Sequence, residues 1–212
     1  MISFKIIPLI LFAGLTLITG LARETDVNIN TKNKSMEQAT FGAGCFWCVE
    51  AIFLRLKGVK DVVSGYSGGE VNNPTYQQVT SGNTGHAEVI QVTYDPSEIT
   101  YEQLLNVFWR THDPTTLNRQ GADVGTQYRS AVFYHNEEQR KIAKHFKARL
   151  NEEKIYNASI VTEITPFDTF YEAEEYHQNY FAKNPEQAYC QVVIVPKLEK
   201  MEVLFKEKLK AH

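Results

Sequence analysis

The stretch Thr40-Phe41-Gly42-Ala43-Gly44-Cys45-Phe46-Trp47-Cys48-Val49-Glu50-Ala51 changes within a few residues from a strand-like pattern to a helical one. It begins as a short β-branched and aromatic run with two glycines. Behind the cysteines, apolar residues recur at the spacing of one helix face, at Val49, Ile52, Phe53 and Leu56. Lys57 and Gly58 then favour a helix C-terminus. The pattern predicts a strand, a glycine turn and a helix.

Cys45 is the candidate nucleophile because it stands at or just before the N-terminus of the predicted helix. Unpaired backbone N–H groups and the positive end of the helix dipole favour an anion at that place. A thiol there loses its proton more easily, and the thiolate is the nucleophilic form of cysteine. We therefore expect Cys45 to be an activated thiol.

Other interpretations of these cysteines stay open. Cysteine often serves packing alone. The C-x-x-C spacing of Cys45 and Cys48 is also half of a zinc site, but the chain has no second C-x-x-C and no histidine pair at ligand spacing. A phosphate loop at 42–44 would need a third glycine or a P-loop lysine. The pattern favours a redox or nucleophilic role.

Residues 1–22 differ in composition from the rest of the chain. Lys5 gives a weakly positive start, 6–18 is an apolar run and 20–22 are small residues or leucine. This is typical of a secretory signal peptide, whose apolar core spans about 7–15 residues. A membrane anchor usually needs about 20 apolar residues, and Pro8 also counts against one. We expect an exported protein, periplasmic or secreted, with an uncleaved membrane anchor as the alternative.

The remaining chain reads as a flexible lead-in over 23–38 and a single domain over 39–212, without internal repeats. A net charge of -3 gives no argument for binding nucleic acid or anionic lipid. Three cysteines are an odd number for an exported chain, which indicates a functional thiol rather than a purely structural disulfide framework.

Hydrophobic periodicity and turn residues predict the later elements. A loop is expected over 112–127, and helices are expected after caps at Thr100 and Asn136, over 168–182 and at the C-terminus. Strands are expected over 59–66, 86–94, 128–135, 159–164 and 190–195. The first six elements follow the order β-α-β-β-α-β of the split βαβ unit. We therefore expect an α+β fold, a two-layer ferredoxin-like sandwich with additional C-terminal helices.

Glu88 is the candidate acid. On the predicted 86–94 strand it shares a face with Ile90 and Val92, so its carboxyl should be desolvated and its pKa raised. A neutral carboxylic acid can donate a hydrogen bond at neutral pH. A register shifted by one residue would instead place Glu88 in solvent. Trp47 falls opposite the apolar stripe of its helix, which predicts that it lines a pocket beside the thiol.

Six motifs follow one another over about residues 38–196, and together they resemble the successive motifs of the A-type peptide methionine sulfoxide reductase family. They are Gly44-Cys45-Phe46-Trp47, Gly65-Tyr66-Ser67-Gly68-Gly69, Asn73-Pro74-Thr75-Tyr76, Gly85-His86-Ala87-Glu88, Gly125-Thr126-Gln127-Tyr128-Arg129-Ser130 and Tyr176-His177-Gln178-Asn179-Tyr180, with Asn184-Pro185 after the last.

The resemblance implies a ferredoxin-like α/β sandwich and a role for each matching residue. Cys45 attacks the sulfoxide sulfur, and protonated Glu88 with the hydroxyls of Tyr76 and Tyr128 binds and protonates the oxygen. The methyl group is received by Phe46 and Trp47, and the substrate backbone amide is bound by Asp123. Donors aimed at the oxygen stabilise charge that develops in the transition state.

The resemblance also implies what the protein works with. Its substrates are oxidised proteins and free methionine (S)-sulfoxide, and its reductant is thioredoxin or a thioredoxin-like protein. Cys45 becomes a sulfenic acid, and a second thiol condenses with it to a disulfide. No metal or organic cofactor is needed, no nucleic acid is involved, and a monomer is expected.

The recycling thiols are the part in which this chain departs from the commonest family pattern. Position 48 is cysteine where many members have glycine, and the segment after Tyr189 lacks the glycine-rich tail with a further cysteine. Cys48 is favoured by its proximity in the helix, and Cys190 by its place in the family pattern. Two other functions remain open, a thioredoxin-like dithiol oxidoreductase and a non-catalytic aromatic cleft for peptides.

Overall fold

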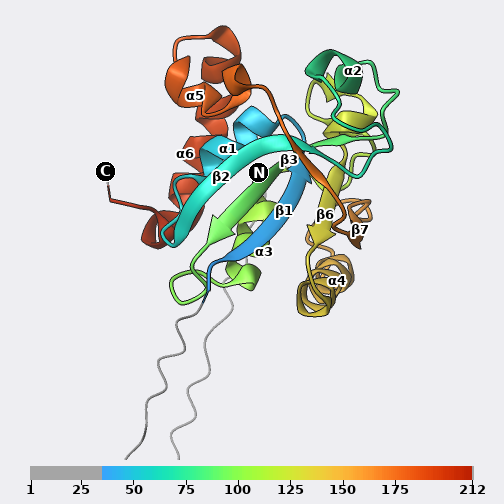
Figure 1. The fold of residues 1–212 in the computed structure, drawn as a ribbon. Helices are drawn as coiled ribbons and strands as arrows, with labels where there is room; N and C mark the ends of the chain where they lie inside the picture. The colour runs from blue at the N-terminus through green and yellow to red at the C-terminus, as the bar shows by residue number, and fades with distance from the viewer. Residues whose placement is uncertain (1–34, 212) are drawn as a thin grey trace, which may run out of the picture. The chain divides into compact units, whose positions relative to one another are not determined.

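A six-stranded sheet with helices packed on it forms the centre of the computed structural model, which describes residues 35–211 (Figure 1). The strand order is β7-β6-β1-β3-β2-β8, and all neighbours are antiparallel except β6 and β7. The strands are β1 (Glu37–Ala43), β2 (Val59–Ser67), β3 (Ala87–Tyr94), β6 (Ser130–Tyr134), β7 (Glu163–Pro166) and β8 (Phe170–Glu172). The fold is therefore α+β, as predicted.

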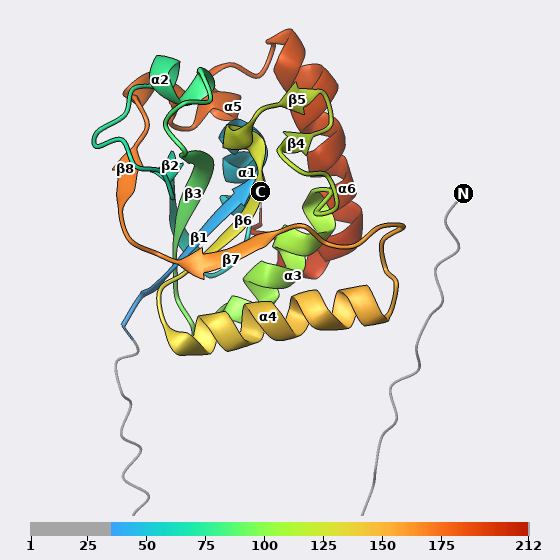
Figure 2. The ribbon, with the colours of Figure 1, turned by 90° about the vertical axis from the view of Figure 1, so that its right-hand side faces the viewer.

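The α-helices are α1 (Phe46–Phe53), α2 (Tyr76–Thr80), α3 (Tyr101–Thr111), α4 (Glu137–Glu152), α5 (Tyr180–Lys183) and α6 (Val195–Phe205). A π-helical turn, Cys190–Ile194, leads directly into α6, and a short 3₁₀ turn, Glu175–His177, precedes α5. Figure 2 shows α4 beside β6 and β7, which it contacts. Among residues 35–211, no helix combines the length and the apolar character that crossing a bilayer requires.

The main core lies on the face of the sheet that α1, α3 and α6 cover. Phe41 on β1 is paired with Ile90 on one side and with Val132 on the other, and all three side chains are fully buried in this core. The opposite face carries Val89 and Phe133, which the segment between β7 and β8 covers. Both faces of β3 are therefore buried from Ala87 to Ile90, whereas Gln91 and Thr93 farther along the opposite face are half-buried.

The first half of the chain follows the sequence predictions closely. Strands β2 and β3 agree with their predicted ranges to within a residue or two, and Thr100 forms the predicted capping box with Gln103. Asn136 caps α4 by accepting from the Gln139 N–H. Strand β1 begins at Glu37, two residues inside the predicted lead-in. The predicted signal peptide and most of that lead-in lie outside the described residues.

The predicted strand at 190–195 is wrong. These residues form the π-helical turn and the start of α6, although the Val192–Val195 run is β-branched. A buried stripe at Cys190, Ile194, Leu198, Met201 and Phe205 explains the difference, since it repeats at helical spacing and faces the core. Packing of that stripe overrides the local β propensity.

The predicted helix at 168–182 is also wrong. Phe170–Glu172 adds to the edge of β2 as strand β8, and only two short helical turns follow. Gly65 explains why the strand can approach so closely, because a Cβ built there would lie 2.4 Å from the Phe170 ring and the Tyr171 carbonyl oxygen. The predicted 112–127 loop also differs, since it contains a small hairpin of β4 (Arg119–Gln120) and β5 (Asp123–Val124).

Candidate functional site

Cys45 lies where β1 turns into α1, and it is the N-cap of that helix as predicted. The turn depends on Gly44, whose φ of +86° is unfavourable for other residues. A Cβ at Gly44 would also meet the Gln120 side chain at 2.6 Å. Cys45 is only 7% exposed, so its thiol faces the interior rather than the solvent.

Glu88 on β3 is bound to the same helix N-terminus. The Phe46 N–H, one of the free donors of α1, donates to Glu88 Oε2 at 3.1 Å. Glu88 is 1% exposed, and burial raises its pKa to about 8 despite that hydrogen bond. The predicted register and the predicted direction of the pKa are both confirmed. At neutral pH most of Glu88 is protonated and can donate a hydrogen bond.

Cys45 and Cys48 form a hydrogen-bonded thiol pair on one turn of α1. Burial, followed by Cys48, raises the pKa of Cys45, so the prediction that its place at the helix N-terminus makes this thiol more acidic is wrong. The hydrogen bond from Cys45 lowers the pKa of Cys48 to about 6, with Lys197 on α6 contributing. The two thiols therefore titrate as a coupled pair, in which the pKa of Cys48 is lowered and that of Cys45 is raised.

Tyr189 joins this pair to the β4–β5 hairpin. Its hydroxyl lies 3.7 Å from Cys48 Sγ and donates to Asp123 Oδ2 at 2.9 Å. Asp123 is therefore held beside the thiols through Tyr189. Tyr189 had no predicted role, although it directly precedes Cys190 in the sequence.

The two predicted phenols lie close to the acid and the thiol. Burial, followed by the charges of Glu88 and Cys45, raises the pKa of Tyr76 to about 12. The pKa of Tyr128 is raised by burial and then by the charge of Glu88. Both hydroxyls thus stay protonated across the neutral range. Tyr76 is fixed through its backbone N–H, which donates to Glu174 Oε1 at 2.9 Å.

Trp47 is enclosed by aromatic residues from the far end of the chain. Its indole stacks on Tyr180 with a centroid separation of 3.7 Å and an interplanar angle of 6°. Its Nε1–H donates to His177 Nδ1 at 3.1 Å. The centroid of the Phe46 ring lies 5.1 Å from that of the His177 imidazole. Trp47 is half-buried in this cluster, and neither His177 nor Tyr180 had a predicted role beyond belonging to a motif.

Cys190 is the third sulfur of this region. It is 0% exposed in the π-helical turn, and burial, with a smaller effect from the charge of nearby Cys48, raises its pKa. All three thiols are free and buried. The fold therefore brings Cys190 near Cys48, although the two are distant in sequence.

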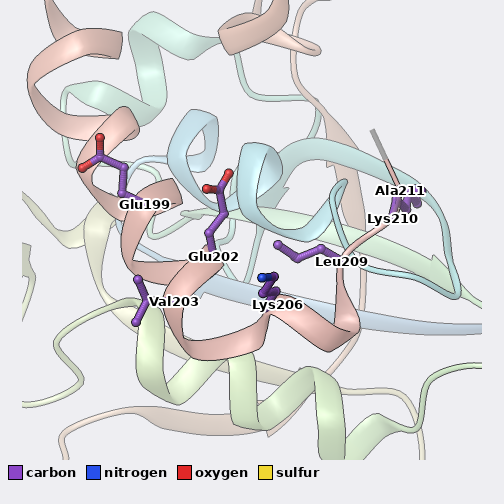
Figure 3. A pocket seen from close by; sticks show the side chains of 7 residues that line it. All are labelled: Glu199, Glu202, Val203, Lys206, Leu209, Lys210 and Ala211. Carbon is purple, nitrogen blue, oxygen red and sulfur yellow. The ribbon is translucent and has the colours of Figure 1, made fainter.

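A surface hollow lies away from this site, between α6 and the end of the described chain (Figure 3). Its lining contains none of the predicted site residues, and consists of Glu199, Glu202, Val203, Lys206, Leu209, Lys210 and Ala211. Figure 3 shows no sulfur among its side chains. The buried cluster around Cys45 is thus the candidate site.

Comparison with known proteins yields one family. Residues 37–209 match the family described as peptide methionine sulfoxide reductase. The chain is 55% identical over 175 residues to peptide methionine sulfoxide reductase MsrA of Acinetobacter baumannii, strain AYE, covering 82% of this chain and 99% of that protein. It is also 55% identical over 177 residues to the MsrA of Saccharolobus solfataricus, strain P2, covering 84% and 99%.

Solved structures give the same result. The crystal structure of reduced Mxr1 from Saccharomyces cerevisiae matches with a TM-score of 0.68 and 37% identity, covering 77% of this chain and 94% of that one. Methionine sulfoxide reductase A of Corynebacterium diphtheriae matches with a TM-score of 0.65 and 36% identity, covering 72% and 76%.

Proposed function

We propose roles for individual residues from the premise that this chain belongs to the peptide methionine sulfoxide reductase family. The protein is a peptide-methionine (S)-S-oxide reductase, an oxidoreductase that reduces methionine sulfoxide to methionine and so repairs oxidised protein. The roles rest above all on one observation, namely that Cys45 and the neutral acid Glu88 meet at the N-terminus of α1.

In the first step Cys45 attacks the sulfoxide sulfur as a thiolate. Glu88 supplies a proton to the sulfoxide oxygen, which ends on Cys45, so the products are methionine and a cysteine sulfenic acid. Tyr76 and Tyr128 donate hydrogen bonds to the same oxygen, because both hydroxyls stay protonated. Phe46 and Trp47 receive the methyl group, and Asp123 binds the substrate backbone amide.

Cys48 makes the thiolate available. The pair carries a single negative charge that rests on Cys48 above about pH 6, with Cys45 donating the hydrogen bond. When the thiol proton of Cys45 moves along this hydrogen bond to Cys48, Cys45 becomes the thiolate. No proton then has to pass from the buried Cys45 thiol to water. Cys48 thus serves first as proton acceptor and afterwards as a resolving thiol.

Recycling proceeds as a relay. Cys48 condenses with the sulfenic acid and releases water, which forms a Cys45–Cys48 disulfide. Cys190 then attacks Cys48, which frees Cys45 and leaves a Cys48–Cys190 disulfide for a dithiol reductant. The position of Cys190 within electrostatic range of Cys48 supports this order. The reductant is thioredoxin or a thioredoxin-like protein, and the enzyme acts as a monomer.

We also infer that the sheet belongs to the ferredoxin-like class. Its inner order is β6-β1-β3-β2, and β1 and β2 flank β3 while α1 connects them. This is the split βαβ arrangement.

Methionine formation from a racemic sulfoxide mixture tests the assignment. With dithiothreitol as reductant, the protein should consume one epimer, and Cys45→Ser should form no methionine because its hydroxyl is far too weak an acid. Consumption of both epimers at similar rates would contradict the assignment. Insulin reduction without methionine formation would indicate a dithiol oxidoreductase, and sulfoxide binding without turnover a binding module.

Export is a separate proposal that rests on the composition of residues 1–22. Sequencing of the mature protein should then find an N-terminus near Arg23. An intact Met1 on protein in the soluble cytosolic fraction would refute export, and an intact Met1 in the membrane fraction would indicate the anchor. An exported enzyme needs a reductant outside the cytosol.

A further inference from the structure

Glu50 is a buried carboxyl that the proposed reaction does not use. It lies on α1, one turn after Trp47, and is 2% exposed. Burial raises its pKa, and the Asn179 N–H, followed by the Ser64 side chain and the Tyr180 N–H, opposes that effect. The Asn179 N–H donates to Glu50 Oε1 at 2.9 Å, across 129 residues of sequence. Burying a carboxyl lowers the stability of the fold unless its oxygens are hydrogen-bonded, so the groups that Glu50 binds indicate its role.

The backbone that Glu50 binds belongs to the segment 177–180, and this segment supplies the stacking partner and the hydrogen-bond partner of the Trp47 indole. Tyr180 stacks on the indole, and His177 accepts the hydrogen bond from its Nε1. Asn179 itself has φ +54°, a left-handed conformation that turns the chain between those two residues. The orientation of Trp47 therefore depends on where this turn is held.

The segment is held at two points. Gln178 fixes it to the sheet edge, since its side chain accepts from the Ser64 N–H at 2.9 Å and donates to the Ser64 carbonyl at 2.9 Å. Glu50 fixes it to α1, the helix that carries Trp47 itself. In this way, the indole and the residues that enclose it are tied to the same helix.

We propose that Glu50 is a positioning residue, which anchors the 177–180 turn on α1 and thereby fixes the orientation of the Trp47 indole. The effect on catalysis rests on the proposed role of Trp47 in receiving the substrate methyl group. A misplaced indole weakens sulfoxide binding, whereas the chemistry at Cys45 and Glu88 keeps its groups. KM should therefore rise more than kcat falls.

Trp47 fluorescence tests the anchoring without reference to catalysis. The chain has two tryptophans, and Trp109→Phe leaves Trp47 as the sole tryptophan, which can be excited selectively over tyrosine. The Trp109 N–H has no partner among the residues that the structure describes, so this replacement loses no such hydrogen bond. In that background, Tyr180→Leu gives the emission maximum of an indole without its stacking partner. Glu50→Ala should shift the emission maximum of Trp47 toward that reference value.

The kinetic arm uses the same variants. Glu50→Ala should raise KM for methionine sulfoxide about tenfold, with kcat changed less than about threefold. Glu50→Gln keeps an acceptor oxygen in place and should restore most of both readouts. If Glu50→Ala does not fold, Glu50→Asp, whose carboxyl is one methylene short of the Asn179 N–H, takes its place with a smaller effect of the same kind.

Gln139→Ala is the matched control. Gln139 is a buried polar side chain that also accepts from a backbone N–H, that of His135, but it lies on α4 outside the site. It should lower stability while leaving emission and KM unchanged. Unchanged Trp47 emission in folded Glu50→Ala or Glu50→Asp overturns the proposal. Altered emission with unaltered KM upholds the anchor, and overturns instead the placement of Trp47 at the substrate methyl group.

Discussion

At the scale of single residues, the proposed reaction depends on a carboxyl that stays protonated in neutral solution. Because burial raises the pKa of Glu88 to about 8, its proton is available below that pH and is lost above it. The rate of methionine formation in a single turnover should therefore fall as the pH rises through about 8. A rate that is flat from pH 7 to 9 would contradict the assignment.

Glu88→Gln isolates the role of this proton. An amide can donate a hydrogen bond but delivers no proton, so the rate should drop about a hundredfold or more and lose its dependence on pH near 8. Glu37→Gln is the control. Glu37 lies at the start of β1 and is also a carboxyl that takes part in a hydrogen bond, which it accepts from the Tyr94 hydroxyl. Full activity in Glu88→Gln would show that the role is wrong.

The two recycling thiols should differ in a single turnover without reductant. Cys48→Ser and Cys190→Ser should each still release one equivalent of methionine per enzyme. Only Cys48→Ser should slow this first step at pH 7, because it removes the group that takes the proton from Cys45. The rate with reductant should fall in both variants.

Mass spectrometry of peptides from substrate-oxidised protein follows the same relay. A Cys45–Cys48 bridge should precede a Cys48–Cys190 bridge. If wild type gives only Cys45–Cys190 and leaves Cys48 free, Cys48 is a packing replacement for glycine.

The site residues could be predicted to the extent that a local pattern fixes them. The alternation of β3 determines the face of Glu88, and the glycine turn before α1 determines the place of Cys45. The ionisation of Cys45 could not be predicted in this way, because burial by other segments outweighs the helix N-terminus. His177 and Tyr189 likewise reach the site through the path of the chain in space.

At the scale of elements, the wrong predictions lie where tertiary packing opposes local preference. The Val192–Val195 run favours a strand, but a helical stripe from Cys190 onward is buried against the core. The aromatic residues after 168 indicate an amphipathic helix, but Gly65 lets Phe170 close the edge of β2.

The π-helical turn gives a prediction at this scale. Cys190 is fully buried there, so a Cys48–Cys190 disulfide that a reductant can reach requires this turn to open. Hydrogen–deuterium exchange over 189–195 should therefore be faster in oxidised than in reduced protein, while α3 stays unchanged. Equal exchange in both states would argue against Cys190 as the outgoing thiol.

At the scale of the whole molecule, a buried histidine makes stability depend on pH. His112 bonds the Phe108 carbonyl through Nδ1 and the Ser130 hydroxyl through Nε2, and burial lowers its pKa to about 4. Between about pH 6.5 and 4 the unfolded chain therefore binds a proton that the folded chain does not. Stability should be fully present above pH 6.5 and fall as the pH drops below it.

Denaturant unfolding at pH 7.5 and pH 5 measures this effect. The full difference between a pKa of 6.5 and one of about 4 corresponds to about 3 kcal/mol, and part of it should be lost by pH 5. His112→Gln should reduce the loss, whereas His145→Gln on the exposed side of α4 should not. An equal loss in His112→Gln would assign the pH dependence to other groups.

The strand order could be anticipated only in part. Element order indicates the inner four strands, because a β-α-β-β-α-β sequence has few compact arrangements. The places of β7 and β8 in the sheet could not be predicted from the element order, since each strand is short and pairs with a strand distant in sequence. A parallel pair at one edge and a three-residue strand at the other are properties of the assembled sheet.

The burial of Cys45, Cys48 and Cys190 protects their thiols from reagents in the solvent. A bulky oxidant, an alkylating reagent or a foreign disulfide therefore meets almost no cysteine sulfur at the surface of the described residues. The raised pKa of Cys45 adds to this protection, because a protonated thiol is a weak nucleophile. Under the proposed mechanism, the reactive thiolate forms on Cys45 only when its proton passes to Cys48.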